Sequence, residues 1–131
     1  MNFRNVKSLE DLLKKADNKM LRQYLETALW SSTGDNSEPL DKNHNIEDIA
    51  KESIEKASKD CDLFIEKAGS LLDGLDLEDI GHDFWLTRNH HGAGFWDGDY
   101  DEEIGKKLTD ISHSFGGCDM YVGDDGNIYL S

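Results

Sequence analysis

The stretch GHDFWLTRNHHGAGFWDGDYDEE, residues 81–103, decides how the second half of the chain is interpreted. Upstream of it, apolar residues recur every three or four positions, which is the period of an amphipathic helix. Within it, short aromatic and β-branched runs are broken by glycine. This change predicts a β-hairpin with strands near 83–88 and 94–97, joined by a turn through Asn-His-His-Gly.

Strand alternation would place large apolar side chains on both faces of the first strand. One face would hold Phe84, Leu86 and Arg88, and the other Asp83, Trp85 and Thr87. One face would then pack on the core, and the other would be covered by a helix or left as an exposed patch.

Helices are predicted before this stretch. A capping pattern at Ser8 starts a helix whose apolar stripe reaches Leu29, with a break at Asp17-Asn18. A polar loop follows over 31–45, anchored by Leu40, and Asn45 caps a helix that ends at Gly69 or Leu72. Asp76-Leu-Glu-Asp79 suits one short turn. Trp30 and Phe64 are expected in the core.

A helix over 101–115 and a second hairpin are predicted after it. Met120–Val122 pairs with Ile128–Leu130, because Asp-Asp-Gly-Asn between them suits the positive φ angles of a tight turn. The chain of 131 residues is therefore expected to form one α+β domain, mainly helical over 1–80 and β-β-α-β-β over 81–131. N-terminal helices would pack on a small, mostly antiparallel sheet in the order hairpin, helix, hairpin.

Charge is strongly polarised along the chain. The net charge is −14. Residues 73–103 contain ten carboxylates and only one arginine or lysine, Arg88. Such a density disfavours direct binding to nucleic acid or to an anionic membrane and favours a basic protein surface as the partner. No apolar run approaches a membrane span of roughly 18 to 20 residues, and no signal peptide is evident, so an intracellular location is expected.

Three segments carry a resemblance. GHDFWLTRNHHGAGFWD at 81–97 and YVGDDGNIYL at 121–130, with LDKNHNIEDIA at 40–50 upstream, resemble a family of small proteins encoded by tailed bacteriophages. The likeness covers roughly residues 20–131. It implies a phage protein acting in the host cytoplasm, and it supplies no catalytic residues.

The leading hypothesis is a non-enzymatic accessory protein that imitates nucleic acid. Its carboxylates would stand in for phosphates and occupy a basic surface of a host nucleic-acid-handling or defence protein, with aromatic side chains as anchors. The predicted binding residues are acidic or aromatic: Asp83, Trp85, Trp96, Asp97, Asp99, Tyr100, Asp101, Glu102 and Glu103. The acidic run also has a plainer interpretation as a solvated face that keeps the protein soluble.

An enzyme or nucleotide-binding protein is the alternative. His90 or His91 would act as general acid or base, Arg88 would bind an anion, and Asp97 or Asp83 would orient the imidazole. The same residues also suit an ordinary polar turn in which Arg88 pairs with a nearby carboxylate. A virion structural or assembly protein is a third hypothesis.

Metal and cofactor motifs are not evident. The run from Asp97 to Leu108 starts like a calcium loop, but it has Glu102 where glycine is needed and Leu108 where a bidentate glutamate is needed. The histidines at 82, 90, 91 and 113 and Cys118 lack zinc-ligand spacing. The sequence therefore predicts no metal and no cofactor, and the two cysteines, Cys61 and Cys118, are expected to be free thiols.

Overall fold

A close crossing of two helices organises the fold in the computed structural model, which describes residues 18–33, 37–91, 94–95 and 100–131. Helix α2 (Asn18–Ser31) packs on helix α4 (Leu77–Arg88). The helices meet at Gly81, where an added Cβ would lie 2.4 Å from the carbonyl oxygen of Met20. Glycine at this position therefore lets the two backbones approach.

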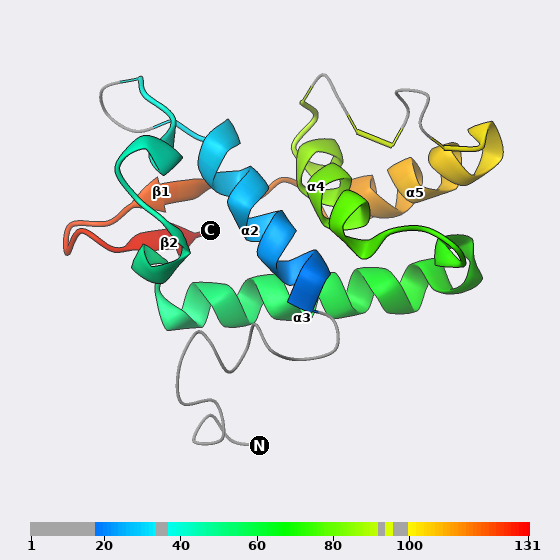
Figure 1. Ribbon diagram of the computed structural model, residues 1–131, viewed down its shortest axis with the longest axis horizontal. Helices are drawn as coiled ribbons and strands as arrows, with labels where there is room; N and C mark the ends of the chain where they lie inside the picture. The colour runs from blue at the N-terminus through cyan, green and yellow to red at the C-terminus, as the bar shows by residue number, and fades with distance from the viewer. Residues whose placement is uncertain (1–17, 34–36, 92–93, 96–99) are drawn as a thin grey trace, which may run out of the picture.

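Two further helices enclose this pair. Helix α3 (Lys51–Ala68) runs beneath α2, and α5 (Glu102–Ser114) lies behind α4 (Figure 1). Short 3₁₀ helices cover Leu40–Lys42 (η2), Ile46–Asp48 (η3) and Gly69–Leu72 (η4). The helices share a core of aromatic rings, of which the largest fully buried include Trp85, Tyr24, Phe64, Phe84 and Phe95.

The C-terminal hairpin is confirmed with the predicted pair of strands. Strands β1 (Met120–Val122) and β2 (Ile128–Leu130) are antiparallel, and Met120 faces Leu130. The amide of Ala50 donates to the carbonyl of Ile128 at 2.8 Å, which joins the hairpin to the start of α3. The sheet has two strands in the described part of the chain, and helices with a terminal hairpin confirm the α+β class.

The strand predicted near 83–88 is wrong, because these residues are the last two turns of α4. The whole run from Asp83 to Arg88 is buried, so the helix carries no polar face that would reveal its period. A short apolar run in this setting cannot be distinguished from a buried strand by pattern alone. In the predicted partner strand, Gly94 and Phe95 form a bend and turn, and residues 96–97 lie outside the described residues.

The structure confirms some of the predicted loop and helix boundaries and differs at others. Leu40 is buried as the expected loop anchor, and Gly69 ends α3 with a φ of 52°. Asn45 caps η3 instead of the long helix, which begins six residues later at Lys51. Trp30 was expected in the core, but it is 44% exposed. The expected helix start at Ser8 lies outside the described residues.

The helix predicted over 101–115 is confirmed as α5. Asp101 is its N-cap, and its carboxylate accepts hydrogen bonds from the amides of Glu103 and Ile104 at 3.2 and 3.4 Å. Across the described ranges, no helix has both the length and the apolar character needed to cross a bilayer.

Candidate functional site

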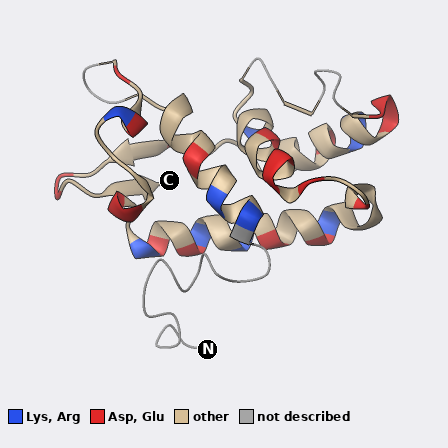
Figure 2. Cartoon of the chain, in the orientation of Figure 1, with Lys and Arg blue, Asp and Glu red and all other residues tan. Residues whose placement is uncertain are grey.

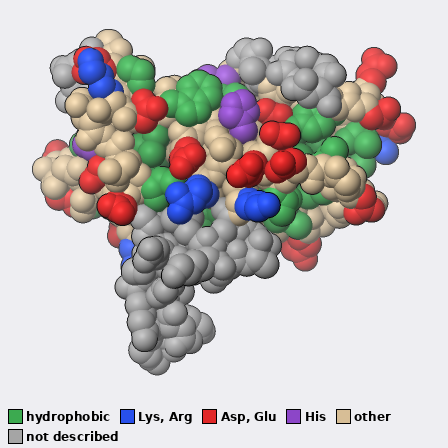
Figure 3. All heavy atoms as spheres, in the orientation of Figure 1, with side chains coloured by type: hydrophobic (Ala, Val, Ile, Leu, Met, Phe, Trp, Pro, Cys, Tyr) green, Lys and Arg blue, Asp and Glu red, His purple; other side chains and the backbone are tan. Residues whose placement is uncertain are grey.

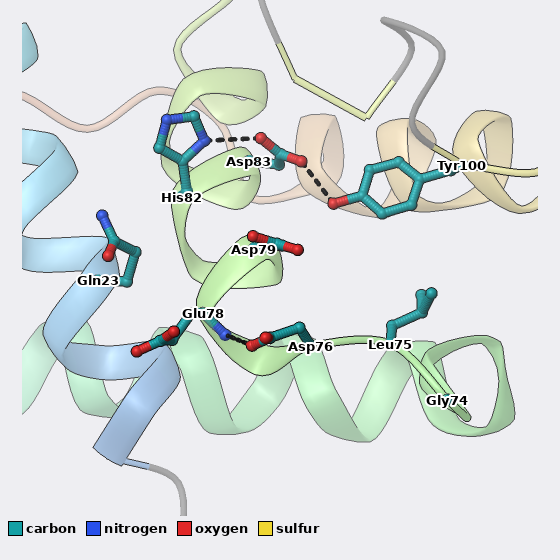
Figure 4. A pocket seen from close by; sticks show the side chains of 9 residues that line it. All are labelled: Gln23, Gly74, Leu75, Asp76, Glu78, Asp79, His82, Asp83 and Tyr100. Carbon is teal, nitrogen blue, oxygen red and sulfur yellow. Dashed lines mark hydrogen bonds and ion pairs between the residues drawn. The ribbon is translucent and has the colours of Figure 1, made fainter.

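A pocket of about 620 Å³ opens where α2, α4 with the connection into it, and Tyr100, two residues before α5, meet (Figure 4). Its lining is mostly acidic or hydrogen-bonding and consists of Gln23, Gly74, Leu75, Asp76, Glu78, Asp79, His82, Asp83 and Tyr100. The pocket volume falls within the range of about 300 to 1,000 Å³ typical of ligand sites.

The first turn of α4 supplies the acidic wall. Asp76 is the N-cap, and its carboxylate accepts a hydrogen bond from the amide of Glu78 at 2.8 Å. Glu78 and Asp79 follow in the first turn and are exposed. The positive end of the helix dipole stabilises carboxylates at these positions, so the fold tolerates this charge density. Asp76-Leu-Glu-Asp79 therefore starts a helix of 12 residues, where one short turn was expected.

A hydrogen-bonded chain of His82, Asp83 and Tyr100 forms the opposite wall. Nδ1 of His82 lies 2.8 Å from one carboxylate oxygen of Asp83, and the Tyr100 hydroxyl donates to the other at 2.5 Å. The Asp83 side chain is only 11% exposed. Because Asp83 is held on both sides, the imidazole and the phenol ring are fixed in orientation. Figure 4 shows the second imidazole nitrogen turned away from the other carboxylates.

Three of the pocket carboxylates form no ion pair with the basic residues that the structure describes. Among the described residues, no lysine or arginine lines the pocket, and none forms an ion pair with Asp76, Glu78 or Asp79. Figure 2 shows acidic positions along the connection into α4 and again at the start of α5. In Figure 3 several carboxylates gather at the centre of this face beside a histidine, with basic side chains along one border.

An exposed aromatic ring lies next to the pocket. The Trp30 indole packs against the His82 ring at 5.8 Å between centroids and at 33° between planes. Half-exposed tryptophan beside carboxylates is the combination expected of a contact surface. Trp30 was predicted in the core as a large apolar residue, although it lies one position beyond Leu29, where the apolar stripe of the predicted helix ends.

Arg88 has a structural position. Its side chain is 3% exposed, and its guanidinium donates to the Asp60 carboxylate at 2.8 Å and to the Tyr24 hydroxyl at 2.9 Å. It also donates to the carbonyls of Gly116 and Phe115, at 2.9 and 3.3 Å. These carbonyls follow α5, where the helix leaves acceptors without intrahelical donors. The hypothesis that Arg88 binds an external anion is therefore not supported by its surroundings.

The other residues of the enzyme alternative are not gathered around the pocket. His90 follows α4 with a φ of 57°, and its ring stacks on His113 at 4.4 Å between centroids. His91 is half-buried, and neither His90 nor His91 lines the pocket. Asp97 lies outside the described residues, so its relation to these histidines is not described.

The predicted binding residues divide into four groups. Asp83 and Tyr100 line the pocket, and Asp101, Glu102 and Glu103 are exposed at the start of α5. Trp85 is 2% exposed and donates its indole N–H to the Ser31 hydroxyl at 2.9 Å, so it belongs to the core and cannot be a surface anchor. Trp96, Asp97 and Asp99 lie outside the described residues.

Asp76, Glu78 and Asp79 were predicted only as members of the acidic run. Gln23, Gly74 and Leu75 were not predicted as site residues. Asp76, Asp79 and Asp83 recur at helical spacing, and His82 falls between the last two on the adjoining surface. That spacing would have identified the wall if 83–88 had been interpreted as helix. Gln23 joins from a distant part of the sequence and carries no local signal.

Within the described ranges, no group of three or more His, Cys, Asp or Glu is placed to hold a metal ion. Both cysteines are buried free thiols, as predicted. Comparison with protein-family models, curated proteins and solved structures finds no significant match for this chain.

Proposed function

We propose that this protein is a non-enzymatic phage accessory protein that binds a basic surface of a host nucleic-acid-handling or defence protein. The observation that carries the proposal is the group of exposed carboxylates of Asp76, Glu78 and Asp79 around a pocket on α4, which form no ion pair within the described part of the chain. Carboxylates held together in this way maintain a negative potential that a cationic surface would relieve. Nucleic-acid-handling proteins present such surfaces to phosphates.

The acidic start of α5 extends the proposed surface. Asp101, Glu102 and Glu103 are exposed, and Tyr100 connects them to the pocket wall through Asp83. Lys107 lies 3.4 Å from Glu103 and partly offsets its charge. Charge of this kind accelerates encounter, while a partly buried aromatic side chain such as Trp30 slows release.

The experiment is affinity capture with the full chain from a bacterial extract at about 50 mM salt, where screening is weak. The expected result is capture of a nucleic-acid-binding protein that is released both by duplex DNA and by about 500 mM salt. Capture that survives this salt concentration and a duplex competitor would refute the proposal, as would failure to capture any nucleic-acid-binding protein.

Matched variants locate the surface. Glu78→Gln with Asp79→Asn removes two pocket charges, and Glu66→Gln with Asp124→Asn removes two exposed charges that do not line the pocket. Amide replacements are chosen because Glu78 and Asp79 lie in the first turn of α4, where lysine would also meet the positive end of the helix dipole. Capture should be lost with the first pair and retained with the second, and equal loss with both would count against this surface.

A further inference from the structure

We infer that the α4 pocket receives an arginine side chain of the basic partner, with Trp30 at its rim as a second contact. This inference rests on the proposed function and names the chemistry of the group that enters the pocket. It depends on the cavity, on its fixed aromatic wall and on the exposed indole, in addition to its charge.

The dimensions and walls suit a long side chain with a charged end. The cavity of about 620 Å³ is built from Gln23 on α2, Leu75 in the connection, the α4 face and Tyr100. Leu75 and the Tyr100 ring are half-buried, so both offer apolar surface to an aliphatic stem. A cationic group at the end of that stem would lie among the carboxylates.

The aromatic groups favour guanidinium over ammonium. The arginine guanidinium is planar, binds carboxylates through paired hydrogen bonds and stacks on aromatic faces. The lysine ammonium is compact and strongly hydrated. The Tyr100 ring is held in place because its hydroxyl donates to Asp83. The exposed Trp30 indole, packed against His82, provides a second flat surface.

The acidic lining disfavours anionic ligands and neutral apolar ligands in this pocket. A phosphate or carboxylate ligand would meet four carboxylates and a single imidazole among the lining residues. A neutral apolar ligand would have to displace water from carboxylates without replacing their hydrogen bonds, which is unfavourable. An organic cation would form ion pairs with the acidic wall and stack on the aromatic ring of the opposite wall.

The test uses N-acetyl-L-arginine amide as the probe, titrated into the ¹⁵N-labelled full chain and followed by NMR. Saturable shifts are expected at the amides of 75–83 and Tyr100 and at the Trp30 indole N–H. N-acetyl-L-lysine amide should bind more weakly by about fivefold, which reflects the loss of stacking and paired hydrogen bonds. Magnesium chloride at matched ionic strength should not reproduce the shifts.

Variants distinguish a site from general charge attraction. Glu78→Gln with Asp79→Asn should abolish the saturable shifts, and Glu66→Gln with Asp124→Asn should leave them unchanged. Trp30→Ala changes an exposed residue and should raise the dissociation constant about threefold while the fold is retained. Shifts spread over the whole acidic surface, equal binding of both probes, or reproduction by magnesium would overturn the inference.

The two proposals fail separately. If the extract yields a DNA-displaceable partner but arginine amide is not preferred, the arginine pocket is wrong and the acidic surface stands. If arginine amide binds at the pocket but no nucleic-acid-binding protein is captured, the proposed function is wrong and the pocket chemistry stands.

Discussion

Replacing Arg88 by methionine tests the assignment of this residue to the fold. Methionine keeps apolar contact near the Phe84 and Phe115 rings, whose centroids lie 5.5 and 5.6 Å from the guanidinium carbon. It removes the donors to Asp60, to the Tyr24 hydroxyl and to the two carbonyls after α5. The change therefore isolates the polar contribution of the buried guanidinium.

The expected loss follows from what remains buried. Removing one partner of a buried ion pair costs about 3 to 5 kcal/mol. Here the Asp60 side chain is 20% exposed and also lies 3.6 Å from Lys56, which compensates part of the loss. The Tyr24 hydroxyl loses a donor in a fully buried position, whereas Phe115 is half-buried and Gly116 is exposed, so their carbonyls contribute less to the loss. We expect the free energy of unfolding to fall by about 3 kcal/mol, within the lower part of that range.

The assay is urea unfolding of the full chain followed by circular dichroism, with linear extrapolation to water. Lys106→Met is the control, because it removes the exposed pair with Asp110 and should cost less than about 1 kcal/mol. Should Arg88→Met fail to fold, Arg88→Lys gives a measurable variant that keeps the charge but loses the planar donor geometry. A loss no larger than that of the control, for either Arg88 variant, would refute the structural role.

Three other perturbations test the packing, the pocket wall and the buried phenol. Gly81→Ala should lower the free energy of unfolding by about 3 kcal/mol, because the new methyl group meets the Met20 carbonyl at 2.4 Å; an unchanged urea midpoint would contradict the close crossing. Tyr100→Phe should cost about 1 to 2 kcal/mol by removing the hydrogen bond to Asp83, and the NMR signals of 75–83 should shift; stability and spectra identical to the wild type would contradict it. Burial raises the pKa of Tyr24 well above its ordinary value, so its contribution to stability is complete below about pH 10, where the unfolded phenol titrates, and is lost as pH rises toward the folded pKa. Tyr24→Phe should therefore flatten the alkaline fall in stability measured by urea unfolding, and an unchanged slope above pH 10 would contradict the burial argument.

Two elements of the fold were predictable because their causes are local. The Asp124-Asp125-Gly126-Asn127 turn fixes the terminal hairpin: Gly126 has a φ of 86°, and the Asp125 carboxylate accepts a hydrogen bond from the Asn127 amide at 3.0 Å. The start of α5 is likewise set by the Asp101 cap and by an apolar stripe on one side of the helix. The residues that predict each element lie within the element itself.

The candidate site was predictable only as a region. The excess of carboxylates from Asp73 onward identified the acidic face, and Asp83 and Tyr100 were among the predicted contact residues. Trp85 was predicted at the surface and is buried, whereas Trp30 was predicted in the core and is exposed. Both predictions were wrong because tryptophan has the same local pattern at the surface and in the core. Their burial is decided by which helix covers them.

The sequence by itself determined the charge of the molecule, the helical first half, the last helix and the hairpin, since composition, capping and turn chemistry act over a few residues. Only the tertiary structure decided that 83–88 is helical, because a helix buried on every side carries no amphipathic period. The same packing turned Arg88 inward toward Tyr24 and Asp60, 64 and 28 residues away in the chain. It also brought Gln23 and Tyr100 to the acidic turn of α4 and so formed the pocket, a result of long-range contacts that no local pattern encodes.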